Sequence, residues 1–150
     1  MIRFKKVDFS NFEYNLSLLK AKLTDFKDKI IVCYLFGSAA LREFKPLSDI
    51  DIAVLYYPDV NQNMSETMIL IDIMSIMNTD EIDLINLSET PLHIQYEILK
   101  KKEILFCSNN EKRIGFETRV IKEYIDFRHI LEEHEQSRLQ RLGIGGHQHG

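Results

Sequence analysis

Several residue types that mark particular classes of protein are scarce in this 150-residue chain. It has only two cysteines, Cys33 and Cys107, too few for a disulfide framework or a zinc set. No apolar run approaches the roughly 18 residues of a membrane span, and the opening segment MIRFKKVDFS lacks the apolar core of a signal peptide. We therefore expect a soluble protein of the reducing cytoplasm that makes no contact with a membrane.

Basic residues are in the minority as well. The 19 Lys and Arg residues face 23 Asp and Glu residues, for a net charge of −4. A stand-alone nucleic-acid binder normally carries a basic face, so we expect no direct binding of DNA or RNA. With 45% apolar and 28% charged residues the chain is neither disordered nor a coiled coil. Its length predicts one domain over residues 1–142, followed by a flexible tail over 143–150.

Glycine is scarce, and its placement is informative. Gly37 is the only glycine among the first 114 residues. It follows the apolar run 30–36, which predicts a strand covered on both faces, and it precedes Ser38. A glycine at a strand-to-helix turn lets a phosphate approach the backbone, where free amides and the Ser38 hydroxyl can hold anionic oxygens. The Gly-Lys-Ser/Thr ending of a Walker loop and the Rossmann glycine set are both absent.

A pair of aspartates opens the next apolar segment. Asp49 and Asp51 are two residues apart in a predicted strand over 49–57, so their side chains point to one face with Cα atoms about 7 Å apart. No lysine or arginine adjoins the pair, and a divalent cation such as Mg²⁺ would remove the repulsion between the two carboxylates. Asp83, inside the predicted strand 82–87, is the candidate third carboxylate. The alternative is that Gly37-Ser38 forms a plain turn, the Asp pair caps neighbouring amides, and Asp83 faces outward.

The remaining pattern alternates helices with strands. Helices are predicted from a capping box at Ser10 and Glu13 to Phe26, over 39–44, over 63–78, over 91–101, and from a second capping box at Ser108 and Glu111 to Gly143. The helix over 63–78 is apolar almost all round, which predicts a buried helix packed on a sheet. Residues 104–107 form a short fourth strand, and Pro46 and Ser48 mark a turn. The alternation predicts an α/β or α+β domain with a small mixed sheet.

The segment Leu35–Leu55, LFGSAALREFKPLSDIDIAVL, resembles the signature of the polymerase-beta-like nucleotidyltransferases in their minimal, single-domain form. The later segments DLINL, PLHIQYEIL and FETRVIKEYIDF are similar to the carboxyl half of these minimal members. The resemblance implies the polymerase-beta-like fold: a small mixed sheet flanked by helices, with a long C-terminal helix. It also assigns residue roles: Gly37 and Ser38 contact the nucleotide triphosphate, and Asp49, Asp51 and Asp83 bind Mg²⁺.

One position departs from the family pattern. Members commonly carry a small residue, often glycine, five positions after the motif glycine, whereas this chain has Arg42. Either the turn is longer here or Arg42 adds a cation near the nucleotide phosphates. The aspartates are unaffected by this difference.

The resemblance further implies an activity. A nucleoside monophosphate is transferred from ATP with the help of two Mg²⁺ ions, and Asp83 is the candidate acceptor of the hydroxyl proton. So short a chain leaves no second domain for an acceptor. Minimal members are commonly paired with a HEPN-domain ribonuclease, and the resemblance implies an antitoxin that adenylylates a tyrosine of this toxin, in a hetero-oligomer. The alternatives are an aminoglycoside-like small-molecule nucleotidyltransferase with a partner subunit, and a non-catalytic antitoxin that occludes its toxin.

Overall fold

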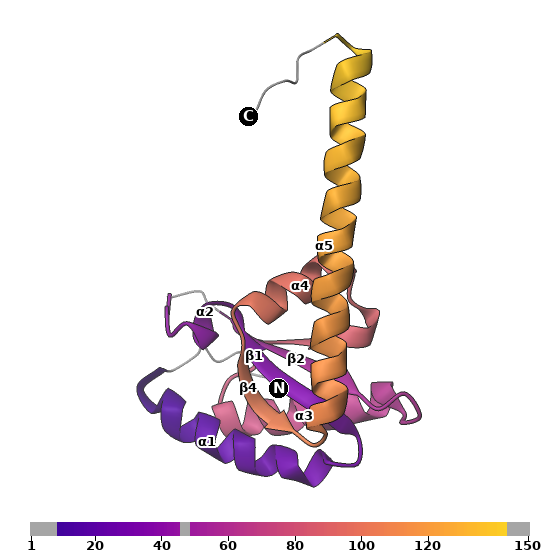
Figure 1. Ribbon diagram of the computed structural model, residues 1–150. Coiled ribbons are helices and arrows are strands. Elements are labelled where there is room, and N and C mark those ends of the chain that lie inside the picture. Colours follow the sequence, from indigo (N-terminus) through magenta and orange to yellow (C-terminus); the bar gives the residue numbers. More distant parts are fainter. Residues whose placement is uncertain (1–8, 46–48, 144–150) are drawn as a thin grey trace.

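The chain is described by a computed structural model that covers residues 9–45 and 49–143. In this part of the chain a four-stranded mixed sheet carries helices on both faces (Figure 1). The strands are β1 (Ile30–Phe36), β2 (Ile50–Tyr56), β3 (Ile82–Asn86) and β4 (Glu103–Cys107). Their order is β3-β2-β1-β4; β1 is antiparallel to both neighbours and β2 is parallel to β3. The predicted mixed sheet is therefore confirmed.

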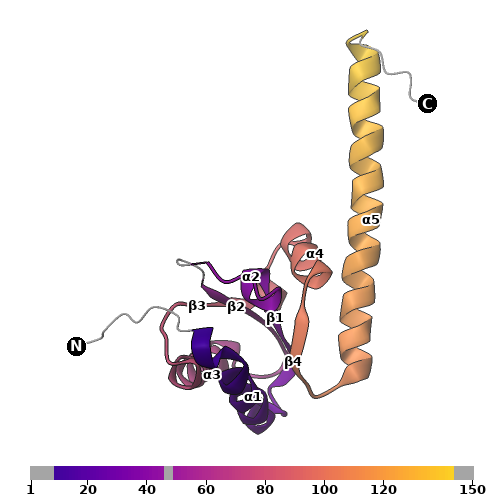
Figure 2. The same cartoon turned by 90° about the vertical axis from the view of Figure 1, so that its left-hand side faces the viewer.

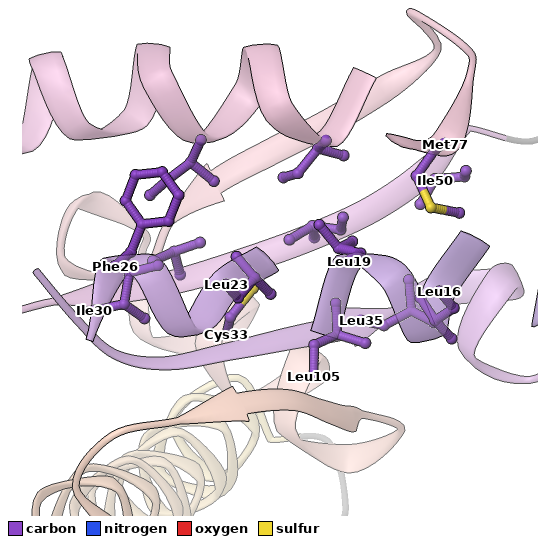
Figure 3. Close-up of a cluster of buried hydrophobic side chains, with 14 of the residues drawn as sticks. Leu16, Leu19, Leu23, Phe26, Ile30, Cys33, Leu35, Ile50, Met77 and Leu105 are labelled. Atoms are coloured by element: carbon purple, nitrogen blue, oxygen red, sulfur yellow. The ribbon is translucent and has the colours of Figure 1, made fainter. Parts of the chain in front are cut away.

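Helices α1 (Phe12–Leu23) and α3 (Gln62–Met77) cover one face of the sheet. Leucines of α1 and isoleucines of α3 recur at helical spacing and meet the side chains of alternate strand residues in a closed apolar cluster (Figure 3). The helical members include Leu16, Leu19, Leu23, Ile69 and Ile73, and the strand members include Cys33, Leu35, Ile50 and Ile52. The predicted apolar face of the first helix is thus confirmed.

Helices α4 (Leu92–Lys100) and α5 (Asn110–Arg141) cover the other face, as the turned view shows (Figure 2). Phe116 and Val120 of α5 are buried here. The Tyr34 hydroxyl, on β1, donates a 2.6 Å hydrogen bond to Glu117, which also pairs with Arg113 at 3.1 Å. These contacts fix the first half of α5 to the sheet.

The short helix α2 (Gly37–Ala40) follows β1 directly, and 3₁₀ turns occupy Phe9–Asn11, Thr24–Phe26 and Leu87–Glu89. The expected helix over 39–44 is therefore wrong at both ends: α2 begins two residues earlier, directly after β1, and ends at Ala40, because the left-handed backbone of Arg42 cannot continue a helix. The turn expected at Pro46 and Ser48 lies outside the described residues, as does the tail beyond Gly143.

Both predicted capping boxes were wrong in detail. Helix α1 begins after Asn11, which makes no side-chain capping bond, rather than after Ser10. Helix α5 is capped by Asn109, whose side chain accepts from the amide of Lys112 at 3.0 Å. Several residues in a row at each site are able to cap a helix, so the residue that caps depends on where the preceding chain leaves the sheet. Ser108 instead donates its hydroxyl to the carbonyl of Ile30.

Helix α3 is buried along one side only, which corrects the expectation of a helix buried all round. Met64 and Ile71 are 62% and 61% exposed, and Met68 is exposed as well. The sheet and α1 reach only the row formed by Ser65, Ile69, Ile73 and Met77. Among residues 9–45 and 49–143, no helix combines the length and the apolar character that crossing a membrane requires.

Candidate active site

The three predicted carboxylates lie at the end of the sheet where β1 finishes and β2 and β3 begin. Asp49 and Asp51 flank Ile50, the first residue of β2. The parallel register pairs Asp51 with Asp83 of β3, and the antiparallel register pairs Asp51 with Phe36 at the end of β1. Directly paired residues of neighbouring strands are about 5 Å apart. Strand pairing therefore brings Asp83 beside a residue that is 32 positions earlier in the sequence.

Alternation along the strands decides to which side these carboxylates open. Ile50 and Ile52 point into the cluster beneath α1 and α3, whereas Ala53 points into the cluster beneath α4 and α5. Asp51 is two residues before Ala53 in the same strand, so its side chain faces the same side, that of α4 and α5. On β3, Asp83 is two residues before Ile85, which also packs on that side, so the two side chains share a face. The carboxylates of Asp51 and Asp83 thus emerge on one face of one sheet end.

Burial and like charge dominate the electrostatics of the cluster. Asp51 is partly buried, and this burial, followed by the charges of Asp83 and Asp49, raises its pKa to about 6. Throughout the described ranges no lysine, arginine or histidine forms an ion pair with any of the three aspartates. The charges that act on the Asp51 pKa among the described residues are therefore those of the two other aspartates, and no cation is among them.

Such a cluster fits the way in which Mg²⁺ is usually held. Within the described residues, no three His, Cys, Asp or Glu side chains form a closed metal-binding group. Mg²⁺ commonly binds one or two carboxylates and completes its octahedral shell with water and substrate phosphates, so an open carboxylate pair suffices. The donor set of Asp49 and Asp51 therefore matches Mg²⁺ bound together with a phosphate ligand.

Gly37 makes room for one of these carboxylates. Its backbone is left-handed, with φ of +70°, which side chains other than glycine rarely adopt. A Cβ atom at this position would lie 2.3 Å from Oδ2 of Asp51. The sequence suggested that this glycine allows a phosphate to approach, and the structure adds that it lets the Asp51 carboxylate pack against the start of α2. Ser38 follows it and is partly exposed at the same end of the sheet.

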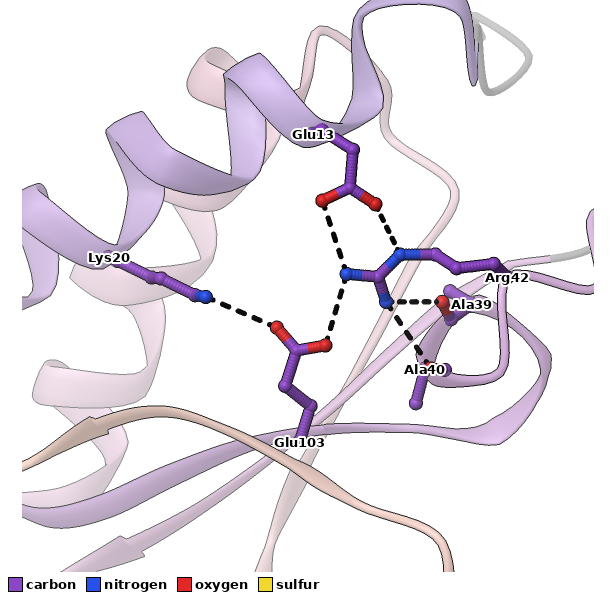
Figure 4. Close-up of polar contacts among 6 residues, drawn as sticks. All are labelled: Glu13, Lys20, Ala39, Ala40, Arg42 and Glu103. Carbon is purple, nitrogen blue, oxygen red and sulfur yellow. Dashed lines mark hydrogen bonds and ion pairs between the residues drawn. The ribbon is translucent and has the colours of Figure 1, made fainter.

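Arg42 occupies the position where family members commonly have glycine, and its φ of +57° is of the kind that glycine favours. Its guanidinium donates to both carboxylate oxygens of Glu13, to Glu103 at 3.0 Å, and to the carbonyls of Ala39 and Ala40 at 3.0 and 3.3 Å (Figure 4). All five N–H donors of the side chain therefore have an acceptor. These contacts join the turn after α2 to α1 and β4, and they direct the guanidinium toward protein groups rather than toward a free ligand.

Sequence reasoning missed the two acidic partners of Arg42. Glu13 and Glu103 lie 29 and 61 positions away from it along the chain. No local spacing signals such a pairing, because only the packing of α1 and β4 beside α2 brings the three residues together. Lys20 also pairs with Glu103 at 3.2 Å and completes the network (Figure 4).

Comparison with known proteins agrees with this geometry. The profile of the family described as polymerase beta, nucleotidyltransferase, matches residues 5–111, well over half of the chain. The chain belongs to this nucleotidyltransferase family. The match includes Gly37, Ser38 and all three aspartates, and it confirms the family to which the sequence pattern pointed. No curated protein sequence matches this nucleotidyltransferase significantly.

Solved structures of similar fold include toxin–antitoxin complexes. One, described as a toxin–antitoxin with AMP-PNP, is 25% identical over 87% of this chain and 94% of the other, with a TM-score of 0.57. A second is a tri-AMPylated Shewanella oneidensis HEPN toxin in complex with an MNT antitoxin, at 23% identity over 87% and 93%, with a TM-score of 0.56. A third, the toxin–antitoxin MntA–HepT, gives 23% identity over 87% and 94% and a TM-score of 0.56. These similarities confirm the predicted polymerase-beta-like fold.

Proposed function

We propose that this nucleotidyltransferase transfers AMP from ATP to a tyrosine hydroxyl of a HEPN-type toxin and acts as its antitoxin. The observation that carries the proposal is the cluster of Asp49, Asp51 and Asp83, which adjoins the glycine turn at Gly37 and pairs with no cation in the part of the chain that the structure describes. Similar structures support the choice of donor and acceptor, since one is described with AMP-PNP and another with an AMPylated HEPN toxin.

Each residue of the cluster has a proposed role. Asp49 and Asp51 hold two Mg²⁺ ions, which supply neutralisation of phosphate charge and a lower pKa of the acceptor hydroxyl. Gly37 and Ser38 face the triphosphate oxygens. Asp83 lies on the edge strand β3 and is exposed, so it can accept the hydroxyl proton from an acceptor that arrives from solvent.

The reaction balances as an in-line displacement. The tyrosine oxygen forms a bond to the α-phosphorus of ATP while the bond between this phosphorus and the β-phosphate oxygen breaks. Pyrophosphate leaves with the electron pair, and the tyrosine proton passes to Asp83. The product carries a phosphodiester anion on the toxin, which repels RNA by the same logic as phosphorylation. Because Asp49 and Asp83 are exposed at the end of the sheet, an acceptor carried by a second protein can reach them.

The experiment combines this chain with ATP, Mg²⁺ and a candidate HEPN-domain toxin from the same organism, and it measures the intact mass of that toxin. We expect an increase of about 329 Da for each AMP, with at least a 100-fold slower reaction for Asp51→Asn. Asp59→Asn is the matched control, because Asp59 is exposed after the opposite end of β2. Excess EDTA should stop the transfer in every sample.

The two alternatives give different results in the same experiment. A non-catalytic antitoxin would inhibit the toxin without any mass change, and its Asp51→Asn variant would inhibit equally well. A small-molecule nucleotidyltransferase would leave the HEPN protein unmodified and would transfer labelled AMP to an aminoglycoside when a partner subunit is present. Either result would reject the proposed function.

A further inference from the structure

Helix α5 carries an apolar row that begins in the core and continues into solvent. Phe116 and Val120 are buried, and Tyr124 stacks on Tyr96 of α4 with ring centroids 3.9 Å apart. Phe127 and Leu131 continue this row at spacings of three and four residues, which keeps them on the same side of the helix. They are nevertheless 46% and 49% exposed. The side of α5 that packs on the domain therefore stays apolar beyond the point where the domain ends.

The topology fixes where this exposed part of the row lies. Strand β4 is antiparallel to β1, and α5 turns back after β4, so α5 runs toward the sheet end where β1 finishes. At 1.5 Å per residue its 32 residues span about 48 Å, whereas the seven residues of β1 span about 23 Å. The second half of α5 thus projects past the sheet end that holds the carboxylates (Figures 1 and 2).

The projecting half of α5 also stands on the side of the sheet to which the carboxylates open. Asp51 and Asp83 share their sheet face with the cluster under α4 and α5. Phe127 and Leu131 therefore lie on the same side of the sheet as the carboxylates, beyond the sheet end. A molecule that contacts this row and the sheet end together would lie over the carboxylates.

The exposed area of the row points to the kind of occupant. A stable pair of proteins buries about 800 Å² on each side. Phe127 and Leu131, both about half-exposed, supply about 200 Å² together, so contact with this row alone would remain well below that requirement. The charged residues of the same half pair within the helix, for example Arg138 with Glu135 at 2.8 Å, as expected of a solvated surface. The occupant must therefore contact the end of the domain as well as the helix.

We propose that Phe127 and Leu131 dock an apolar helix of the protein acceptor and hold its hydroxyl group over Asp51 and Asp83. This inference rests on the proposed function, because it takes the HEPN-type toxin as the occupant. The docking row and the carboxylates of Asp51 and Asp83 lie on one side of the sheet, so contact with the row selects acceptors that are large enough to reach both.

The test measures binding of a candidate HEPN-domain toxin from the same organism to the full chain by sedimentation and by biolayer interferometry. We expect the double variant Phe127→Ser/Leu131→Ser to weaken the complex at least tenfold. Ile125→Ser is the matched control, because Ile125 is also 46% exposed but lies on another side of α5, two residues before Phe127. The control should bind within twofold of the unaltered chain, and helix content by circular dichroism should be unchanged in both.

Three results would overturn the docking row: equal binding by the double variant, an equal or larger loss with Ile125→Ser, or a dimer of the chain alone that the double variant abolishes. Comparing binding with AMP transfer tests the proposed function separately from the docking row. If the unaltered chain binds the HEPN protein through the row but transfers no AMP to it, the docking row stands and the proposed function fails. If the unaltered chain does not bind the HEPN protein, both fail.

Discussion

Replacing Gly37 with alanine tests how closely the glycine turn and the Asp51 carboxylate depend on each other. Two costs are expected, and they have different origins. A left-handed φ costs alanine about 1 kcal/mol more than glycine. The new Cβ would lie 2.3 Å from Oδ2 of Asp51, so the carboxylate must leave its favoured rotamer at a further cost of about 1 kcal/mol. We therefore expect Gly37→Ala to lower the free energy of unfolding by about 2 kcal/mol.

A double-mutant cycle separates the two costs. In an Asp51→Ala background the close atoms Oδ2 and Cγ are gone, and the remaining Cβ contact at 3.4 Å is ordinary. Gly37→Ala should then cost only the backbone strain, which leaves a coupling energy of about 1 kcal/mol between the two positions. Urea denaturation in EDTA measures all four proteins of the cycle. Affinity for the ATP analogue AMP-PNP with Mg²⁺, measured by calorimetry, should fall at least tenfold in the Gly37→Ala single variant, because its carboxylate is displaced.

Gly115 provides the matched control. It lies within α5, its φ is not left-handed, and a Cβ atom added to it would meet no other atom within 4 Å. Gly115→Ala should raise stability by up to about 1 kcal/mol through helix propensity and leave nucleotide affinity unchanged. A Gly37→Ala variant that is as stable as the unaltered chain, or that loses equal stability with and without Asp51, would refute the reasoning.

Two other predictions concern charges near the site. The folded-state pKa of Asp51 is raised from 3.8 to about 6. Ionisation of Asp51 therefore leaves the free energy of unfolding unchanged below about pH 4 and lowers it as the pH rises through 6. Asp51→Asn should therefore stabilise the metal-free protein above pH 7 by about 1 kcal/mol after allowance for solvent screening, and Asp83→Asn should lower the Asp51 pKa in carboxyl ¹³C NMR titrations; equal stability gains at pH 4 and pH 8 would contradict this. At Arg42, both Arg42→Met and Arg42→Gly lose the guanidinium contacts, but only Arg42→Gly also relieves the strained backbone. Urea denaturation should therefore give Arg42→Met a free energy of unfolding about 1 kcal/mol lower than that of Arg42→Gly; the reverse order would show that backbone strain is unimportant there.

The part of the site that could be predicted depends on neighbours in the sequence. The i, i+2 spacing of Asp49 and Asp51 and the break at Gly37 are local, so the sequence alone placed them at strand ends. Asp83 could be nominated only because a carboxylate in an apolar strand is unusual. Its position beside Asp51 follows from the parallel register of β2 and β3, which no local pattern specifies.

Other features could not be predicted because they depend on how much of each surface the fold covers. The composition of α3 indicated burial, but a small sheet and one neighbouring helix cover only one row of it and leave Met64 and Ile71 exposed. The same holds for Phe127 and Leu131, whose spacing matches that of buried residues although the domain ends before it reaches them. Periodicity shows which residues share a side of a helix, and only the tertiary structure shows what that side contacts.

The anchoring of Arg42 also orders events during synthesis of the chain. All the proposed active-site residues lie between positions 37 and 83, and Glu13 precedes them. Glu103, however, belongs to β4, the strand that closes the free side of β1. A nascent chain that has reached Lys100 therefore contains every proposed catalytic group, but it lacks both the outer strand and one of the two acidic anchors of the turn after α2. The site acquires its full support only after Glu103 and the rest of β4 have left the ribosome, so these contacts of long sequence separation place its completion late in folding.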